Sequence, residues 1–448
     1  MNPKRKGGFV SVATIVSQST PSGFSAIAVI RLSGNKATNI VAKISNTDVT
    51  LKHQKAELRP VYIKKKLIDE AIFTAFMSPR SYTGEDIVEI SCHGNLHICE
   101  AIITETVRLG ARIAEPGEYT KRAFLNGKLN LLQAESVSLL INARSLEAVK
   151  QQTKNLNGGA TEKIEQIKKD LISVLSHLEY ELDVSEDPLL NKTTINHIKT
   201  SLKTCLKNTA SMIKTFERGS ALSNGVKVAF VGKPNVGKST LVNKILGIEK
   251  SITSKIPGTT RDLVSTETIL KGIPVTLVDT AGIHTTKNHI EKEGIKRSFK
   301  EIKTADLIVS LFCKKLQAVD IKEVKEQIYV YNKADIAPYE GDNKKVFSIS
   351  ATKGMGVGRL VQQIEKKISG LRVNAAEPLL TTIRQKEAMV KVSSCLSNSI
   401  NLFIKDNQQI ELPAQEIRGA ISNIDLFTGK TTTNDILDNV FSTFCVGK

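Results

Sequence analysis

The chain has 448 residues, a length that exceeds one ordinary hydrophobic core and favours about three domains. Hydrophobic residues make up 40% and charged residues 24%, as in soluble globular proteins, and no stretch is apolar over the length that a membrane span requires. The formal net charge of +18 is compatible with a polyanionic partner such as RNA and equally with a lysine-rich solvated surface.

Residues 1–128 predict a small α/β domain. Its strand-like runs are SAIAVIRLSG, EAIFTAFM and EDIVEISCHG, and its helix-like run is HICEAIITETVRLG. The N-terminal run MNPKRKGGFVSVATIV has no small-residue cleavage pattern and breaks into SQSTPSG. We therefore expect it to contain the first strand and not to be a signal peptide.

Six cysteines are scattered through the chain without a paired spacing, which predicts a reducing compartment and a cytoplasmic protein with no membrane association. The densest group, SCHGNLHIC, contains Cys92, His93, His97 and Cys99. Zinc ligands normally come from two separated pairs, and Gly94 in this group is typical of a strand-to-helix turn. This pattern disfavours a zinc site.

Residues 129–220 predict a first helical segment, since apolar residues recur there at helical spacing, as at Leu171, Val174, Leu175, Leu178 and Leu182. Residues 221–374 change to short buried strands separated by helical stretches, which predicts a doubly wound parallel sheet. Helical spacing returns in residues 375–448, with Leu396, Ile400 and Phe403 and with the tail NDILDNVFSTFCVGK. The simplest organisation is one discontinuous helical bundle domain with the sheet domain inserted into it.

The inserted domain contains a phosphate-binding motif. Residues 232–239 read GKPNVGKS, after the strand-like VKVAFV and before the helix-like TLVNKIL. The glycines let backbone N–H groups close around phosphates, Lys238 would reach the β and γ oxygens, and Ser239 would ligate magnesium. The strand and helix around the motif make a chance match a weak explanation.

Further motifs follow in the order that a GTPase requires. Thr260 in IPGTTRD would complete the magnesium shell, and Asp279 and Gly282 in DTAG would serve the metal and the γ-phosphate. Asp335 in NKAD would accept hydrogen bonds from the ring N–H and the exocyclic amine of guanine. Adenine lacks this pair of donors. The predicted GTP-binding residues are Asn235, Val236, Gly237, Lys238, Ser239, Thr240, Ser254, Lys255, Ile256, Pro257, Gly258, Thr259, Thr260, Asp279, Thr280, Ala281, Gly282, Asn332, Lys333, Ala334, Asp335, Ser350, Ala351 and Thr352.

The whole chain resembles the bacterial tRNA modification GTPase family MnmE, also called TrmE. Its N-terminal marks are IRLSG, SYTGEDIVEISCHG and PGEYTKRAFLNGKLNLLQAES, and its C-terminal mark is FCVGK. The resemblance implies an N-terminal domain that binds a reduced one-carbon folate such as 5-formyltetrahydrofolate and forms a homodimer, and an inserted Ras-like GTPase domain. It also implies a flavin-dependent partner, MnmG (GidA), with which an aminomethyl or carboxymethylaminomethyl group is added to the wobble uridine of certain tRNAs.

Matching motifs imply the folate ligands Arg31 in IRLSG, Glu89 in IVEIS and Lys128 in NGKLN, together with the terminal Lys448. A carboxylate can accept from pterin N–H groups, and cations suit the glutamate tail or the formyl oxygen. The resemblance places FCVGK near this site, so that Cys445 is a candidate participant in the modification chemistry. The alternative for Cys445 is an ordinary buried helix cysteine.

The residue after DTAG is Ile283, which cannot orient an attacking water as a glutamine would. Asn235 could instead help to hold a potassium ion, with Ser254, Ile256 and Thr259 completing its shell, as in potassium-activated GTPases that pair their G domains. The water would then be oriented by Glu291, the position that matches the family motif. The neighbouring Glu293 leaves this assignment open, and an exposed helix glutamate is the alternative for either residue. Ser254 stands where the family often has threonine.

The chief rival function is a GTP-driven ribosome-assembly switch that performs no modification chemistry. It would explain the basic charge equally well, but it gives no reason for a formylfolate site in the first 128 residues. A folate-dependent carrier that transfers its aminomethyl group to protein is a third, poorly supported interpretation.

Overall fold

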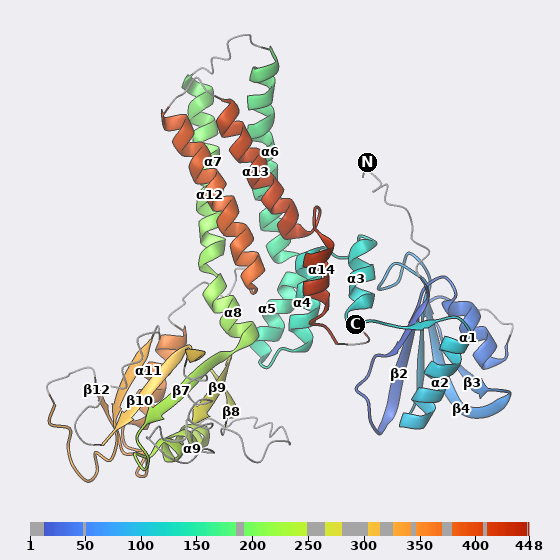
Figure 1. The fold of residues 1–448 in the computed structure, drawn as a ribbon, viewed down its shortest axis with the longest axis horizontal. Coiled ribbons are helices and arrows are strands. Elements are labelled where there is room, and N and C mark those ends of the chain that lie inside the picture. Colours follow the sequence, from blue (N-terminus) through green and yellow to red (C-terminus); the bar gives the residue numbers. More distant parts are fainter. Residues whose placement is uncertain are drawn as a thin grey trace, which may run out of the picture. The chain divides into compact units, whose positions relative to one another are not determined.

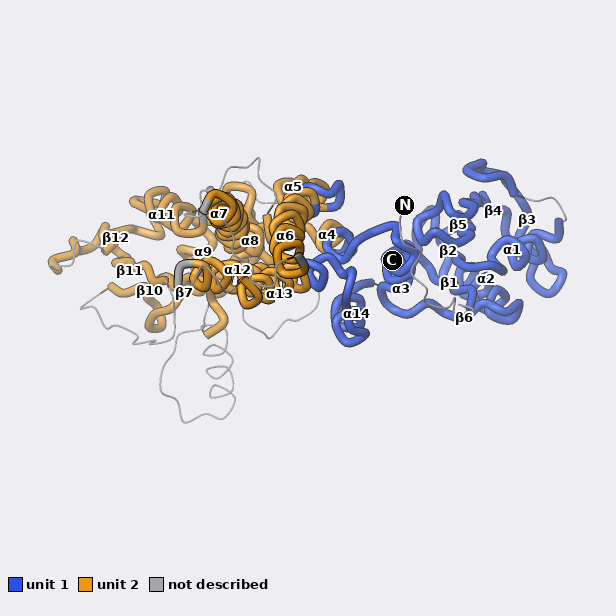
Figure 2. Tube along the Cα trace, turned by 90° about the horizontal axis from the view of Figure 1, so that it is seen from above, with its two compact units in different colours: residues 1–138, 156–161, 424–448 blue, residues 139–155, 162–423 orange. Residues whose placement is uncertain are grey.

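The computed structural model describes residues 13–47, 51–184, 192–248, 265–279, 303–313, 326–341, 346–369, 379–405, 410–445 and 447. The chain divides into two compact units, which Figure 2 shows in different colours. Unit 1 comprises residues 1–138, 156–161 and 424–448, and unit 2 comprises residues 139–155 and 162–423.

Unit 1 contains a six-stranded sheet in the order β3-β4-β5-β2-β1-β6. Its strands are β1 (Ile15–Gln18), β2 (Ser25–Ser33), β3 (Ala56–Ile63), β4 (Lys66–Phe76), β5 (Ile87–Gly94) and β6 (Arg112–Ile113). Neighbouring strands are antiparallel except for β1 and β6. Helices α1 (Ala37–Ser45) and α2 (Leu96–Arg108) pack on the sheet, and the core between them includes Ile30, Ile40 and Ile102 (Figure 1).

The C-terminal tail of the chain also belongs to unit 1. Helix α14 (Asn434–Phe441) packs beside α3 (Glu118–Leu125), and α4 (Leu131–Ile141) begins in the same unit. Phe124, Leu131, Phe441 and Phe444 share one hydrophobic cluster. Burial of such large side chains contributes roughly 1.5–3 kcal/mol each, enough to hold the tail against the segment that follows the sheet.

Unit 2 contains most of a helical bundle. Its helices are α5 (Leu146–Leu156), α6 (Gly159–Val184), α7 (Lys192–Lys214), α8 (Phe216–Asn224), α12 (Ile383–Lys405) and α13 (Glu411–Thr428), and a few terminal residues of α5, α6 and α13 fall in unit 1. The long helices α6, α7, α12 and α13 run side by side in Figure 1. Their facing stripes are buried, as predicted from the spacing of Leu171, Leu178, Leu396 and Phe403. No helix in the described ranges is both long and apolar enough to cross a membrane.

The second sheet of the chain lies in unit 2 and has the strand order β12-β11-β10-β7-β9-β8. Its strands are β7 (Val226–Gly232), β8 (Ser265–Leu270), β9 (Ile273–Asp279), β10 (Leu307–Phe312), β11 (Gln327–Tyr331) and β12 (Val346–Ser348), accompanied by α9 (Lys238–Ile248) and α11 (Val357–Ser369). All pairs are parallel except β8 with β9. The order changes direction at β7, and in such sheets ligands bind outside the carboxyl ends of the strands at this point.

The predicted fold class is confirmed: an α/β N-terminal part, a discontinuous helical bundle and an inserted parallel sheet are all present. The sequence pattern did not indicate α1, α3, β3, β6, β8 or β12. Pro60 argued against a strand at β3, because proline cannot donate a hydrogen bond within a sheet. The structure tolerates it because β3 lies at the edge of its sheet. The tail was predicted as one helix, but α14 ends at Phe441. The predicted domain boundaries at residues 128, 220 and 374 stay a prediction.

Candidate functional site

The phosphate-binding motif connects β7 to α9, as its sequence context predicted. Asn235 and Gly237 have φ angles of 60° and 96°, so the loop turns through the left-handed region twice. A Cβ atom on Gly237 would lie 2.3 Å from Nδ2 of Asn332. Glycine is therefore required at this position both by backbone conformation and by the close approach of a buried side chain.

Lys238 is the first residue of α9 and is 7% exposed. Its Nζ donates to the backbone oxygens of Gly232 at 3.0 Å and Lys233 at 3.2 Å, which are neutral acceptors. Burial lowers the pKa of the Lys238 ammonium, and the carboxylate of Asp279 partly offsets this effect. A polyphosphate in the loop would give the buried ammonium a stronger negative partner.

Ser239, in the first turn of α9, lies beside Asp279, the last residue of β9. The Ser239 hydroxyl donates to Oδ2 of Asp279, and Oδ1 of Asp279 is buried with no hydrogen-bond partner in the described part of the chain. A hydroxyl, a carboxylate and an unsatisfied carboxylate oxygen are the groups that a hydrated magnesium ion prefers. The residues present therefore fit magnesium beside the phosphate loop.

Asn332 joins two of the predicted motifs. Its side chain is 3% exposed; Nδ2 donates to the Val236 backbone oxygen at 2.8 Å, and Oδ1 accepts from the Ala351 N–H at 2.9 Å. The phosphate loop, NKAD and the segment SAT (residues 350–352) are thus held together by one amide. Asn332 was predicted as a site residue, but the bridge that its side chain forms between the other two motifs was not predicted.

A cavity of about 340 Å³ opens between these segments, and it is lined by Asn235, Gly237, Lys238, Ser239, Thr240, Asn332, Lys333, Ala351 and Thr352. Val236 instead points into the hydrophobic core, and Asp335 is exposed. The predicted residues 254–260, Thr280, Ala281, Gly282 and Glu291 lie outside the described residues. The site therefore unites the phosphate loop with the motifs predicted to recognise the base, and the roles of its residues stay predictions.

Arg31 and Glu89 face each other in the register of β2 and β5. Arg31 Nε donates to Glu89 Oε1 at 2.9 Å, and the side chains remain 18% and 26% exposed. The guanidinium lies 5.7 Å from the ring centre of Tyr119, whose pKa is raised to about 12 by burial. Lys128 contacts a different segment, since its Nζ donates to the Pro79 oxygen at 3.0 Å. The structure therefore brings together two of the proposed folate ligands but not the third, and Lys448 lies outside the described residues.

The FCVGK tail contacts the same part of unit 1. The Gly447 oxygen accepts from Arg31 at 3.4 Å and from the Ser19 hydroxyl at 3.3 Å. Gly447 has a φ of 101°, and a Cβ atom there would lie 2.7 Å from the Gln18 oxygen, so glycine is required. Cys445 is exposed and accepts from the Gly117 N–H through its backbone oxygen at 3.4 Å. The exposed thiol of Cys445 thus lies two positions before Gly447, whose backbone oxygen contacts Arg31.

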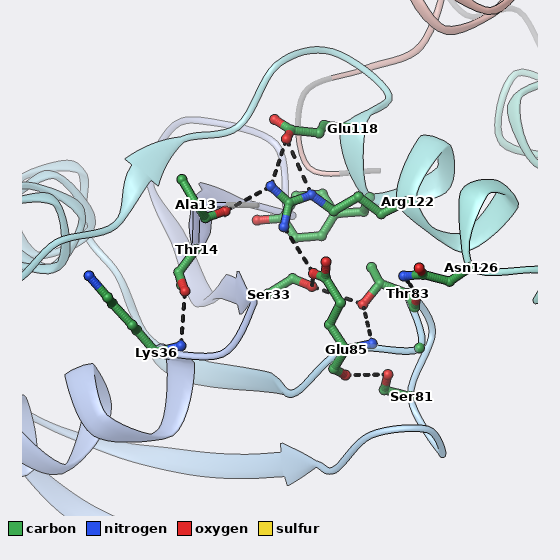
Figure 3. Close-up of polar contacts among 12 residues, drawn as sticks. Ala13, Thr14, Ser33, Lys36, Ser81, Thr83, Glu85, Glu118, Arg122 and Asn126 are labelled. Carbon is green, nitrogen blue, oxygen red and sulfur yellow. Dashed lines mark hydrogen bonds and ion pairs between the residues drawn. The ribbon is translucent and has the colours of Figure 1, made fainter. Parts of the chain in front are cut away.

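A buried ion-pair network, missed in the sequence analysis, connects two of the N-terminal motifs (Figure 3). Arg122 is 4% exposed and donates to Glu118 Oε1 at 2.8 Å, Glu85 Oε2 at 2.9 Å and the Ala13 oxygen at 2.8 Å. Glu118 also accepts two hydrogen bonds from Arg112. Burial raises the pKa of Glu118, but the hydrogen bonds from Arg112, the Glu115 N–H and Arg122 outweigh it and leave the pKa lowered. The network ties SYTGED to GEYTKR.

The SCHGNLHIC segment forms the predicted strand-to-helix turn. Gly94 ends β5, and Asn95 caps α2 by accepting from the His97 N–H at 2.9 Å. Burial raises the pKa of the Cys92 thiol to about 12, and His93 pairs with Asp69 at 2.6 Å. Among the described residues, no group of three or more His, Cys, Asp or Glu side chains is arranged to hold a metal ion.

Comparison with known proteins gives matches over almost the whole chain. The family described as GTP-binding protein TrmE N-terminus matches residues 14–128, and the MnmE helical domain matches residues 131–445. The tRNA modification GTPase MnmE of Fervidobacterium nodosum is 37% identical, with 99% of each chain covered. That of Aquifex aeolicus is 36% identical, with 97% of this chain and 99% of its own covered.

Among solved structures, the G domain of the T. maritima FeoB iron transporter aligns with 33% of this chain and 99% of its own. Its sequence identity is 23% and its TM-score is 0.25.

Proposed function

Because the chain belongs to the MnmE family of tRNA modification GTPases, we propose that it hydrolyses GTP in the modification of the tRNA wobble uridine. With a flavin-dependent partner, MnmG, it would add an aminomethyl or carboxymethylaminomethyl group to C5 of that uridine. The observation that carries the proposal is the cavity in which one amide, that of Asn332, joins the phosphate loop to SAT. A ribosome-assembly switch is disfavoured because residues 14–128 match the TrmE N-terminus.

The residues that line the cavity, together with Asp279 and Asp335, have distinct roles in this proposal. Lys238 contributes positive charge to the β- and γ-phosphate oxygens, and the backbone N–H groups of residues 235–239 donate to them. Ser239 and Asp279 would hold magnesium, which supplies further neutralisation of phosphate charge when bound. Asp335, exposed at the end of NKAD, would accept from guanine.

For the attacking water, we propose a potassium-activated mechanism in a homodimer. Asn235 is exposed, has a φ of 60° and lines the cavity, so its side-chain oxygen can face a cation beside the phosphates. A potassium ion there would supply the positive charge that an arginine finger supplies in other GTPases. Glu291 is the proposed water-orienting residue.

In unit 1 we propose that Arg31 and Glu89 bind a reduced one-carbon folate, with Lys128 and Lys448 as further ligands. The Arg31–Glu89 ion pair is partly exposed, and Arg31 lies over the ring of Tyr119. A flat heteroaromatic ring could therefore replace part of the contact between Arg31 and Glu89. Gly447 contacts Arg31, which supports a role for the neighbouring Cys445 thiol in the modification chemistry.

The test is nucleoside analysis of total tRNA from cells that lack this gene. Modified wobble uridine should be lost and should return when the wild-type gene is supplied. A Lys238→Ala variant should fail to restore it, whereas Lys366→Ala, an exposed lysine of α11, should restore it. Normal wobble uridine in the deletion strain would contradict the proposal.

A further inference from the structure

Helix α7 has an unusual distribution of charge. Its 23 residues include five lysines and no aspartate or glutamate. With roughly 100° of rotation per residue, the lysines fall within a sector of roughly 80°. The buried residues of α7 lie on a different side of the helix, and they are Ile195, Ile198, Leu202, Cys205, Thr209 and Met212. The lysines are Lys192, Lys199, Lys203, Lys207 and Lys214.

Helix α12 packs against α7 (Figure 1) and is also basic in composition. Its 23 residues include four basic side chains and a single acidic one, Glu387. The two helices therefore carry a net charge of +8, nearly half of the chain's +18. The other two long helices, α6 and α13, carry four basic and nine acidic side chains. The bundle thus has a basic pair of helices and an acidic pair.

The lysine stripe is not explained by the fold of α7 itself. Lys203, Lys207 and Lys214 are exposed, and none of them forms an ion pair within the described part of the chain. Like charges four residues apart, such as Lys203 and Lys207, destabilise a helix. A partner with negative charge would compensate this repulsion.

The chemistry around the stripe favours a nucleic-acid backbone over a protein. The exposed neighbours on α7 are one imidazole, His197, and hydroxyl and amide side chains that suit phosphate and sugar contacts, namely Thr193, Asn196, Thr200, Thr204, Asn208 and Ser211. Protein interfaces centre on buried aromatic or arginine anchors, and α7 exposes no large hydrophobic side chain within its described residues. From Lys199 to Lys214 the stripe is roughly 22 Å long. For comparison, double-stranded DNA carries about a dozen phosphate charges over that length.

We propose that the α7–α12 face, meaning the lysine stripe of α7 with the adjoining surface of α12, binds the phosphate backbone of tRNA. The proposal rests on the proposed function, which supplies a tRNA substrate, and it adds the surface that holds this substrate. The contact would be to backbone phosphates, so it would position tRNA without reading its sequence.

The test compares two variants of the full-length protein that lose the same charge. The first is the triple variant Lys203→Gln, Lys207→Gln and Lys214→Gln. The matched control is Lys64→Gln, Lys65→Gln and Lys66→Gln, at the exposed turn between β3 and β4. Binding of a tRNA transcript is measured by fluorescence anisotropy over a range of potassium chloride concentrations, and thermal unfolding verifies the fold.

For the α7 variant we expect affinity at least tenfold weaker at 0.1 M salt and a salt slope, log Kd against log salt, smaller by about 2 to 3. The control should keep the wild-type slope. An unchanged slope in the α7 variant, or an equal decrease in both variants, would overturn the proposal. The proposal would also be overturned if the α7 variant bound tRNA normally but no longer bound a flavin-containing partner protein, because the face would then dock a protein. Wobble-uridine analysis with the wild-type gene tests the proposed function separately.

Discussion

Substitution of Glu118 by glutamine should destabilise unit 1 strongly, because the carboxylate is the centre of the buried network in Figure 3. Glu118 is 7% exposed and accepts from Arg112, Arg122 and the Glu115 N–H. Glutamine would turn an N–H₂ group toward these donors and leave the 4% exposed Arg122 with one carboxylate partner fewer.

Breaking a buried ion pair costs about 3–5 kcal/mol. Arg112 is 43% exposed, so solvent screens its interaction with Glu118 and the lower end of the range applies. We therefore expect a loss of about 3 kcal/mol at pH 7. The matched control is Asp438→Asn, which breaks the more exposed pair of Asp438 with Lys121 on the same helix and should cost at most about 1 kcal/mol.

The effect should depend on pH in a defined direction. The pKa of Glu118 is lowered in the folded chain, so its stabilisation is fully present above the unfolded pKa of about 4.3 and is lost as the pH falls through the folded value. The difference between wild type and Glu118→Gln should therefore shrink below about pH 4.

Hydrogen exchange of the α3 amides, corrected for the intrinsic rate at each pH, measures the local free energy of opening without requiring two-state unfolding of the whole chain. If the opening free energy of Glu118→Gln at pH 7 lies within about 0.5 kcal/mol of that of Asp438→Asn, the reasoning is refuted. A difference from wild type that stays constant into acid would refute the assignment to the Glu118 carboxylate.

Three further predictions concern the two candidate sites. Gly237→Ala should weaken binding of a fluorescent GTP analogue at least tenfold, because its Cβ would collide with Asn332 and the φ of 96° disfavours alanine. The control Gly247→Ala, with open space around its Cβ, should bind the analogue normally. Equal affinities of the two variants would show that the loop adapts. Glu89→Gln should weaken binding of 5-formyltetrahydrofolate in calorimetry, and unaltered affinity would remove Glu89 from the proposed folate ligands. GTP hydrolysis should be faster in potassium than in sodium, and Asn235→Ala should lose this preference; equal rates of the wild-type protein in the two salts would contradict the potassium mechanism.

The local parts of this protein were predictable from the sequence. GKPNVGKS between a strand and a helix depends on residues that are neighbours in the chain, and β7 and α9 lie where the motif placed them. Four strands of the second sheet, β7, β9, β10 and β11, were predicted by their apolar runs, which are typical of strands covered on both faces. The bundle helices were predicted by the spacing of residues such as Leu178 and Leu396.

The tertiary structure alone showed how distant residues complete these motifs. Asn332 bonds the backbone of Val236, 96 positions earlier, and Arg31 contacts Gly447, 416 positions later. The Glu118–Arg122 network was invisible in the sequence because charged side chains are usually exposed, and only packing shows which of them are buried together. The charge of the α7–α12 face also appears only when two helices almost 170 residues apart pack side by side. Local spacing determines which element forms, whereas burial and long-range contacts depend on the packing of the whole chain.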